Sequence, residues 1–228
     1  MPAGPEADID DGGDLSRRGA PGKNTMDLLR FFRRSPPIRD LAALADFIDR
    51  NAAFVTQKGL YEYSRARAGH YAKVLFAEAS FQAAIEISRW RAYPLGLAMV
   101  GEVTEGILRP QFGERRLAAV AALREVVLDV FDRYPAPQAL SKAEWMESRR
   151  ELSHRLELIG LQAPKLAKDI PEPFVDGYFV LMPIHEQLRG SDYPTTRNYL
   201  RVTLCNIHEE LTKRMDTPAV ASALCRDV

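Results

Sequence analysis

Residues 81–110 read FQAAIEISRWRAYPLGLAMVGEVTEGILRP and form the most apolar stretch of the chain. Between positions 92 and 108 the only charged side chains are Glu102 and Glu105, and apolar residues fill most of the circumference of a helical wheel. A helix of this kind is typical of a protein core rather than a surface. The run is too short and too charged for a membrane span, which needs about 20 apolar residues. We therefore expect the rest of the chain to pack around it.

Pro94 interrupts this stretch. Proline lacks a backbone N–H and disfavours a helical conformation in the residue before it. We expect one helix over about 81–93, a kink or break at Tyr93-Pro94, and a second helix over about 95–109. The two would form a kinked pair at the centre of the fold.

Apolar residues recur at helical spacing on both sides of the central stretch. Ser141 and Glu144 form a capping box, which marks a helix start. No alternation of strands with helices supports a parallel sheet. We predict an all-α fold, a compact domain of about eight helices. The helices expected outside the central stretch cover about 38–50, 52–68, 71–78, 114–133, 141–159, 174–188 with a break at Pro183, and 194–214.

The two ends of the chain differ in composition from its middle. Residues 1–25 are rich in Gly, Pro and charge and poor in large apolar side chains, which is typical of a disordered tail. The helical pattern begins at Met26, so a translation start there is an open alternative. We expect one helical domain over 26–214 and a fraying C-terminal tail over 215–228.

Charge and cysteine content narrow the class of protein. Lys plus Arg and Asp plus Glu both number 31, whereas a nucleic-acid binder usually has a basic excess. We expect no nucleic-acid partner. Cys205 and Cys225 fit no disulfide framework or zinc motif, and Cys205 falls in an apolar helical pattern that predicts a buried thiol. No cleavable leader is visible, so we expect a cytoplasmic protein.

Glu102 and Glu105 are the first candidates for chemistry. They are three residues apart and hence neighbours on one helix face, and a buried carboxylate is costly unless it is paired or protonated. Together with Glu86 they would supply an acid/base pair or half of a carboxylate metal site. The alternative, which we favour, is that one glutamate pairs with an arginine and the other reaches solvent.

Two expected helix ends combine basic with aromatic residues. Arg65, Arg67 and His70 lie at one end, and Arg89 and Arg91 at the other. If these ends meet, they would bind an anionic group, because guanidinium pairs bidentately with carboxylate or phosphate. We favour the alternative, in which the arginines pair with glutamates inside the protein.

Other catalytic and metal patterns are incomplete. Glu151 and His154 form the Glu-x-x-His pair of di-metal helical bundles, but those sites need this pair twice. Asp129 and Asp132 lack the second acidic motif of helical prenyl-transferring enzymes. The Gly-x-Ser-x-Gly elbow of α/β-hydrolases is absent. We therefore expect no metal and no cofactor.

The segment MDLLRFFRR near the N-terminus is short and amphipathic. It would contact a membrane surface or a partner, or, as we favour, form a helix that packs on the body of the protein. The residues that would make a membrane-surface contact are Leu28, Phe31, Phe32, Arg33 and Arg34.

Two runs resemble a known group of proteins. They are FFRRSPPIRDLAALADFIDRNAAFVTQKGLYEYSRARAGHYAKVLF and SRWRAYPLGLAMVGEVTEGIL, and they are similar to a family of small, uncharacterised, all-helical bacterial proteins, some of which are labelled esterases. The resemblance covers roughly residues 28–214. It implies a helical fold and, through those members, hydrolase activity. No catalytic residue is carried over, because no hydrolase motif here matches one.

These observations favour a non-catalytic adaptor or assembly factor that binds another protein through a helical surface. The alternative is a helical enzyme, a hydrolase of the esterase kind, with a Glu/Arg site on the central helices. A cavity with converging Glu and Arg side chains would favour the enzyme, and a filled core with an apolar surface groove would favour the adaptor.

Overall fold

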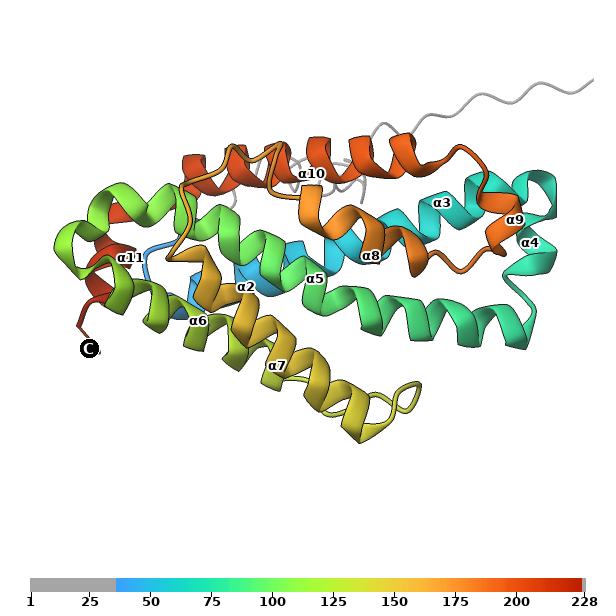
Figure 1. Ribbon diagram of the computed structural model, residues 1–228, viewed down its shortest axis with the longest axis horizontal. Coiled ribbons are helices and arrows are strands. Elements are labelled where there is room, and N and C mark those ends of the chain that lie inside the picture. Colours follow the sequence, from blue (N-terminus) through green and yellow to red (C-terminus); the bar gives the residue numbers. More distant parts are fainter. Residues whose placement is uncertain (1–35, 227–228) are drawn as a thin grey trace, which may run out of the picture. The chain divides into compact units, whose positions relative to one another are not determined.

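The computed structural model describes residues 36–226, and within that range it contains helices and loops but no β-strand (Figure 1). The predicted all-α fold is confirmed. The predicted disordered tail and the amphipathic segment at 26–34 lie outside the described residues. The α-helices are α2 (Leu41–Ala53), α3 (Gly59–Ala68), α4 (Ala72–Leu75), α5 (Ala79–Phe112), α6 (Arg116–Asp132), α7 (Lys142–Ile159), α8 (Val175–Val180), α9 (Glu186–Arg189), α10 (Tyr193–Arg214) and α11 (Thr217–Leu224). Six of these have ten or more residues, somewhat fewer than the eight helices predicted.

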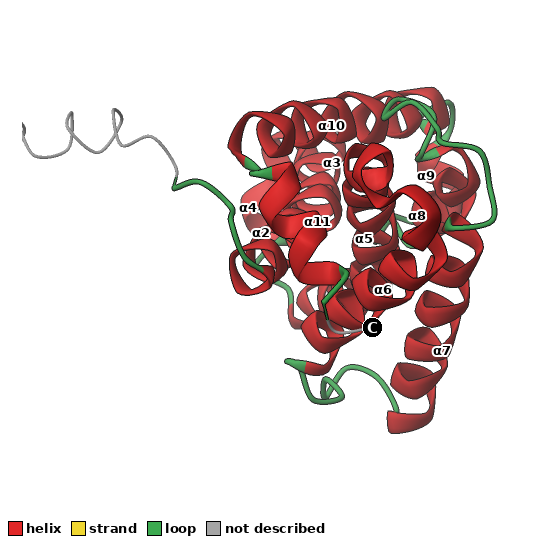
Figure 2. Ribbon diagram, turned by 90° about the vertical axis from the view of Figure 1, so that its left-hand side faces the viewer, coloured by secondary structure: helices red, strands yellow, loops and turns green. Residues whose placement is uncertain are grey.

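The apolar stretch lies in α5, which runs through the middle of the other helices when they are viewed end-on (Figure 2). Helices α2, α6, α7, α10 and α11 all pack against it. Leu97, Met99 and Val100 expose no surface, although they point in different directions around the helix. A helix that is apolar on all sides is stable in water only where neighbours cover every side, and this explains its central place.

The predicted break at Pro94 is wrong, because α5 continues through it as one helix of 34 residues. Proline removes a single backbone donor and costs a helix interior about 3 kcal/mol. Tyr93 and Leu97, on either side of the proline, are almost completely buried. Burial of each large apolar side chain contributes about 1.5–3 kcal/mol, so packing outweighs the local penalty. The central element is therefore one continuous helix rather than two.

Helices α2 and α3 also join into one path, through a π-helical turn, η1 (Phe54–Lys58). The sequence predicted a gap before residue 52, but no break occurs there. Opposite this turn, Gly96 of α5 lets the two helices approach closely: a Cβ atom at this position would lie 2.6 Å from the backbone oxygen of Ala52. Any side chain at 96 would push α2 and α5 apart.

The predicted C-terminal tail is also wrong in the described range, because residues 217–224 form α11 and pack on α5. Val220 and Leu224 are fully buried. The backbone N–H of Ile38 donates to the carbonyl of Arg214 (2.9 Å), and Ile38 accepts from the N–H of Asp216 (2.9 Å). The chain beyond 214 is thus held to the start of the described fold.

The expected burial of Cys205 is wrong, because Cys205 is exposed, whereas Cys225 is buried. On α10 the buried face passes through Leu200, Leu204 and Ile207. Cys205 follows Leu204 and therefore points about 100° away from that face. Helical periodicity correctly predicted the helix, but it did not assign Cys205 to the correct face.

Candidate functional site

Glu102 and Glu105 are both buried, and each carboxylate has a cationic partner. Glu105 accepts two hydrogen bonds from Arg109, at 2.7 Å from Nε and 2.9 Å from Nη2. Glu102 accepts one from Nζ of Lys165 at 2.8 Å. Pairing with an arginine, which we favoured for one glutamate, is found for Glu105. Glu102 pairs with a lysine from the loop after α7 rather than facing solvent alone.

Little space adjoins these carboxylates. The cavity that Glu105 lines has a volume of about 10 Å³, which is close to the smallest space that holds one water molecule. Arg109 also donates to the carbonyls of Ile159 and Gln162, so it anchors the end of α7. The geometry around Glu105 is that of a structural ion pair with no room for a substrate.

Glu86 lies far from this pair on the same helix. It is 16 residues before Glu102 in the sequence, which corresponds to about 24 Å along a helix axis. Its Oε1 accepts from Trp90 Nε1 (2.6 Å) and from Arg89 Nη2 (3.1 Å). Internal pairing of Arg89, which we favoured, is thus present. The three candidate glutamates do not converge on one site.

The five basic candidates reach different partners. Arg67 pairs with Asp192 (3.1 Å), ahead of α10, whereas Arg91 pairs with Glu144 at the start of α7 (2.8 Å). Arg65 lines a hollow of about 350 Å³ beside α4. His70 is exposed, and its ring lies 4.0 Å from that of Tyr71. Among residues 36–226 the ion pairs given for the two helix ends involve different partners, Asp192 for Arg67, Glu86 for Arg89 and Glu144 for Arg91, and these contacts do not build the anion site that the sequence suggested.

A polar cluster that the sequence reading missed surrounds Asp49 of α2. Its carboxylate accepts hydrogen bonds from the hydroxyls of Tyr93 (2.7 Å) and Tyr134 (3.1 Å) and from Arg133 (3.3 Å). Burial, followed by the bond to Asp49, raises the pKa of Tyr93 well above its usual range. The three donors lie 44 to 85 positions after Asp49 in the sequence, so no local sequence pattern connects them to it. The cluster ties α2 to α5 and to the end of α6.

The metal patterns lead to no site in the part of the chain that the structure describes. No group of three or more His, Cys, Asp or Glu residues there is placed to hold an ion. Glu151 and His154 are exposed on α7. Asp132 forms a bidentate pair with Arg149 (2.6 Å at the shorter contact). The absence of a metal site therefore stays a prediction.

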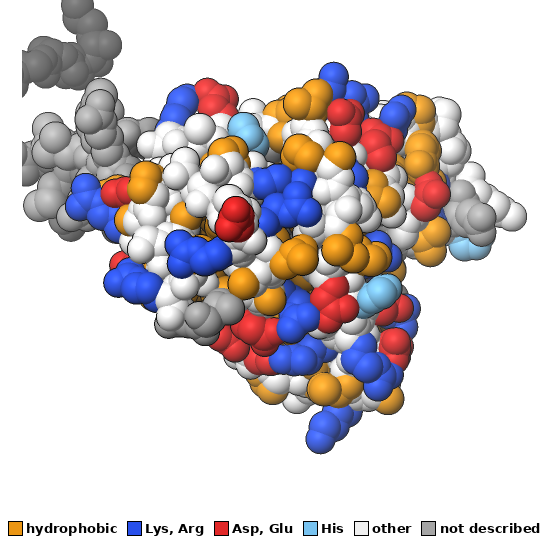
Figure 3. All heavy atoms as spheres, turned by 60° about the vertical axis from the view of Figure 1, so that its left-hand side comes forward, with side chains coloured by type: hydrophobic (Ala, Val, Ile, Leu, Met, Phe, Trp, Pro, Cys, Tyr) orange, Lys and Arg blue, Asp and Glu red, His pale blue; other side chains and the backbone are white. Residues whose placement is uncertain are grey.

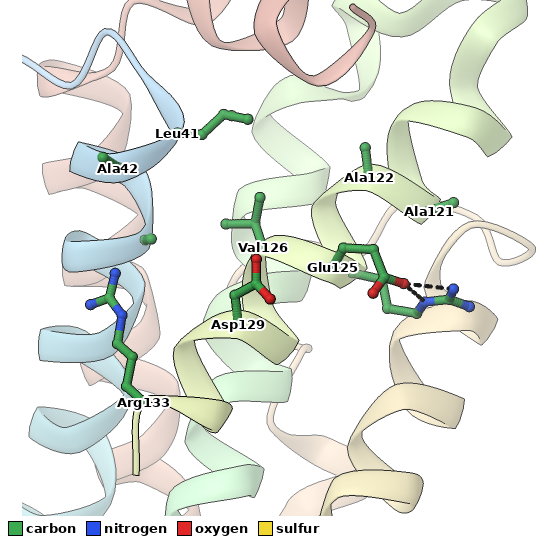
Figure 4. A pocket seen from close by; sticks show the side chains of 10 residues that line it. Leu41, Ala42, Ala121, Ala122, Glu125, Val126, Asp129 and Arg133 are labelled. Atoms are coloured by element: carbon green, nitrogen blue, oxygen red, sulfur yellow. Dashed lines mark hydrogen bonds and ion pairs between the residues drawn. The ribbon is translucent and has the colours of Figure 1, made fainter. Parts of the chain in front are cut away.

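A surface groove between α2 and α6 is the largest hollow described here, with a volume of about 550 Å³ (Figure 4). We call it the α2/α6 groove. Ala45 is buried at its base, Leu41 and Val126 are partly buried, and Ala42 and Ala121 are exposed at its edges. In Figure 4 the side chains of Leu41 and Val126 lie on facing helices across the opening. Four of the ten residues that line the groove are alanine, so part of its wall consists of short side chains.

Charged residues of α6 follow one side of the α2/α6 groove. Glu125, Asp129 and Arg133 are four residues apart and so share one helix face. Arg133 is held by Asp46 (2.9 Å) and Asp49. Glu125 accepts from Arg124 through Oε1 only, and Asp129 has no hydrogen bond or ion pair among the described residues. The groove lining therefore holds two carboxylates and two guanidinium groups, and among the described residues Asp129 is the one of these four without an ion pair.

On the face drawn in Figure 3, basic and acidic side chains are interspersed with apolar ones. This agrees with the equal numbers of acidic and basic residues.

We compared the chain with protein-family models, curated proteins and solved structures. No family model, curated protein or solved structure matches the chain. None of the described helices combines the length and the apolar character that a membrane crossing requires.

Proposed function

We propose that this protein is a non-catalytic adaptor that acts in the cytoplasm and binds a helix of another protein in the α2/α6 groove. The observation that carries the proposal is the groove itself, a depression with four alanines in its lining and the carboxylate of Asp129, which has no ion pair among the described residues, on one side. Amphipathic helices commonly dock by laying an apolar face into such a groove.

The chemistry of the groove specifies the partner. Exposed Ala42 and Ala121 allow a helix backbone to approach closely, because no long side chain stands in its way. Leu41 and Val126 offer apolar contacts at the centre. Asp129 would then lie beside the docked helix and would pair with a lysine or arginine flanking its apolar face, whereas Glu125 is already paired with Arg124. Complementary charges of this kind favour the correct partner and speed its association.

The enzyme alternative has less support. It needs a ligand-sized cavity where Glu and Arg side chains converge, yet the cavity at Glu105 is about 10 Å³. Glu86 and Glu102 lie on widely separated turns of α5. The core residues of α5 are covered on all sides by neighbouring helices, which is the arrangement we associated with an adaptor.

The test is to capture the partner from the groove and then block the groove. A photo-crosslinking amino acid at Ala121 should label one protein in the cells from which the chain comes, through a helical peptide identified by mass spectrometry. With that peptide, Ala42→Arg should weaken binding about tenfold or more, since it fills the groove with a bulky cation. Asp129→Asn should weaken binding less and should reduce its salt dependence.

Ala143→Arg is the matched control, because Ala143 is an exposed alanine on α7, outside the groove. It should leave binding unchanged. Equal binding by wild type and Ala42→Arg, measured by calorimetry with the folded variant, would refute the α2/α6 groove as the docking site.

A further inference from the structure

The corner between α3 and α5 receives little support from the core. The chain leaves α3 at Ala68 and turns at Gly69, whose φ of 54° lies in the region that favours glycine. It then forms a 3₁₀ turn, η2 (Gly69–Tyr71), and the short helix α4, and neither element contains a buried residue. In Figure 1, α4 lies at one end of the described helices and α11 at the other. We call residues 69–76 the α4 corner.

Large apolar side chains are exposed on the α4 corner. Tyr71 is 65% exposed and Val74 is 61% exposed. They are three residues apart in a helical backbone and therefore lie on one side of it. A short helix is stable in a protein mainly through burial of its apolar face, and these two side chains are largely left without such burial. Exposed apolar residues that gather in one place mark a surface that another molecule covers.

Aromatic contacts hold the inner side of the α4 corner. The ring of Phe76 lies 5.2 Å from that of Phe81 and 6.1 Å from that of Tyr61, measured between ring centres. Phe81, at the start of α5, is buried. These contacts tie the corner to both neighbouring helices, so its exposed residues are carried on a packed support.

Cations accompany the exposed apolar residues. Residues 63–77 include Arg65, Arg67 and Lys73 but no acidic residue. Arg67 is paired, as described above. Arg65 and Lys73 line the hollow of about 350 Å³ together with Glu62, and neither cation has a side-chain hydrogen bond or ion pair among the described residues. Both are exposed, so their long side chains are able to reach an anion beside the corner.

This combination fits an anionic lipid surface better than a nucleic acid. Tyrosine is enriched at the level of lipid headgroups, and aliphatic side chains enter the boundary with the acyl chains. Lysine and arginine are attracted by anionic headgroups. A single-stranded nucleic acid needs successive aromatic platforms for its bases, whereas the aliphatic Val74 shares the exposed side of the corner with Tyr71.

We propose that the α4 corner docks on the surface of a membrane that contains anionic lipid. Tyr71 and Val74 enter the headgroup region, and Arg65 and Lys73 lie beside the lipid phosphates. The attraction is between exposed charges and a charged surface, so it requires no fixed hydrogen bond. No residue of the α2/α6 groove takes part, and the proposal does not depend on the proposed function.

The experiment measures co-sedimentation of the full chain with vesicles of phosphatidylcholine that contain or lack phosphatidylserine. Wild type should bind the vesicles with phosphatidylserine much more tightly, and added salt should weaken this binding because exposed charges are screened. Each cation near an anionic surface contributes a factor of about five to binding. Arg65→Gln combined with Lys73→Gln should therefore weaken binding about 25-fold.

Matched substitutions outside the corner are the controls. Lys142→Gln combined with Lys168→Gln changes the net charge equally at two exposed lysines and should leave binding unchanged. Val74→Ser should weaken binding about fivefold, because the exposed part of the valine no longer leaves water. Leu161→Ser, at a leucine that is 70% exposed outside the corner, should have no effect. All substituted positions are exposed, and circular dichroism checks that each variant folds.

Several results would overturn the proposal. One is no binding of wild type to phosphatidylserine vesicles at low salt, and another is equal loss in the corner variant and the lysine control. Loss of binding only when Phe31→Ser and Phe32→Ser are combined would assign the contact to the N-terminal amphipathic segment instead. Binding to a single-stranded oligonucleotide but to neither kind of vesicle would assign the corner to nucleic acid.

Discussion

Each half of α5 contains a Glu–Arg ion pair, but the pair in the C-terminal half is buried and the pair in the N-terminal half is partly exposed. In the C-terminal half, Glu105 and Arg109 form an ion pair whose side chains are 2% and 12% exposed. In the N-terminal half, Glu86 and Arg89 form one that is 43% and 28% exposed. Removing one member of a buried pair leaves the other charge uncompensated and away from water. When one member of an exposed pair is removed, water hydrates the remaining charge. Burial of the pair, rather than its presence, therefore decides how much stability depends on it.

The largest expected effect comes from Glu105→Gln. The variant removes the negative charge and leaves the guanidinium of Arg109 with neutral acceptors alone, namely the new amide oxygen at 105 and the carbonyls of Ile159 and Gln162. Breaking one side of a buried pair costs about 3–5 kcal/mol, so the free energy of unfolding measured in urea should fall by that amount. The anchor between α5 and the end of α7 would loosen at the same time.

The matched control is Glu114→Gln, because Glu114 is an exposed glutamate after α5 with no ion pair among the described residues. It should change stability by less than about 0.5 kcal/mol, the usual range for a surface position. If the two variants lost similar amounts, the contrast between the halves of α5 would be wrong.

An intermediate effect is expected from Arg89→Ala in the other half of α5. The guanidinium lies 4.8 Å from the centre of the Trp90 ring and pairs with Glu86. An exposed ion pair is worth up to about 1 kcal/mol and a partly exposed cation–π contact about 0.5–1 kcal/mol. We expect a loss of about 1 kcal/mol in urea unfolding.

Arg91→Ala provides the comparison for this variant. Arg91 is 48% exposed and its partner Glu144 is 49% exposed, so its removal should cost less than that of Arg89. A loss below about 0.5 kcal/mol for Arg89→Ala would show that the contacts of Arg89 with Glu86 and Trp90 contribute nothing measurable.

The fold could largely be predicted from periodicity, because apolar spacing reports which helix face is buried. The helix expected over 114–133 is α6 (Arg116–Asp132), and the one expected over 194–214 is α10 (Tyr193–Arg214). The reading failed at Pro94, where a local rule was applied to a helix that is covered on every side. Such an error follows from physics: the penalty of proline is local, while the packing that outweighs it comes from residues distant in sequence.

The candidate site could not be predicted in the same way. The lining of the α2/α6 groove includes Ala42 and Ala45 from one helix and Ala121 and Ala122 from another. Alanine is also the residue with the highest helix propensity, so alanine at these positions looks like ordinary helix sequence. Only the packing of α2 on α6 turns four common residues into a groove. The glutamates drew attention instead because charge in an apolar stretch is rare, although their role here is to hold helices together.

The smallest effect on stability is expected at Glu144, the exposed partner of Arg91, and it depends on pH. The capping bonds from Ser141, and then Arg91, lower the pKa of Glu144 from 4.5 to about 2. A carboxyl whose pKa is lower in the folded protein adds stability above its ordinary pKa and loses that contribution as the pH falls from about 4.5 toward 2. Glu144→Gln cannot titrate, so wild type should exceed it in stability at neutral pH and the difference should vanish in acid. Urea midpoints measured across that pH window, with Glu114→Gln as the control, test this directly. A difference that stayed constant with pH would mean that the capping bonds of Glu144 do not depend on its charge.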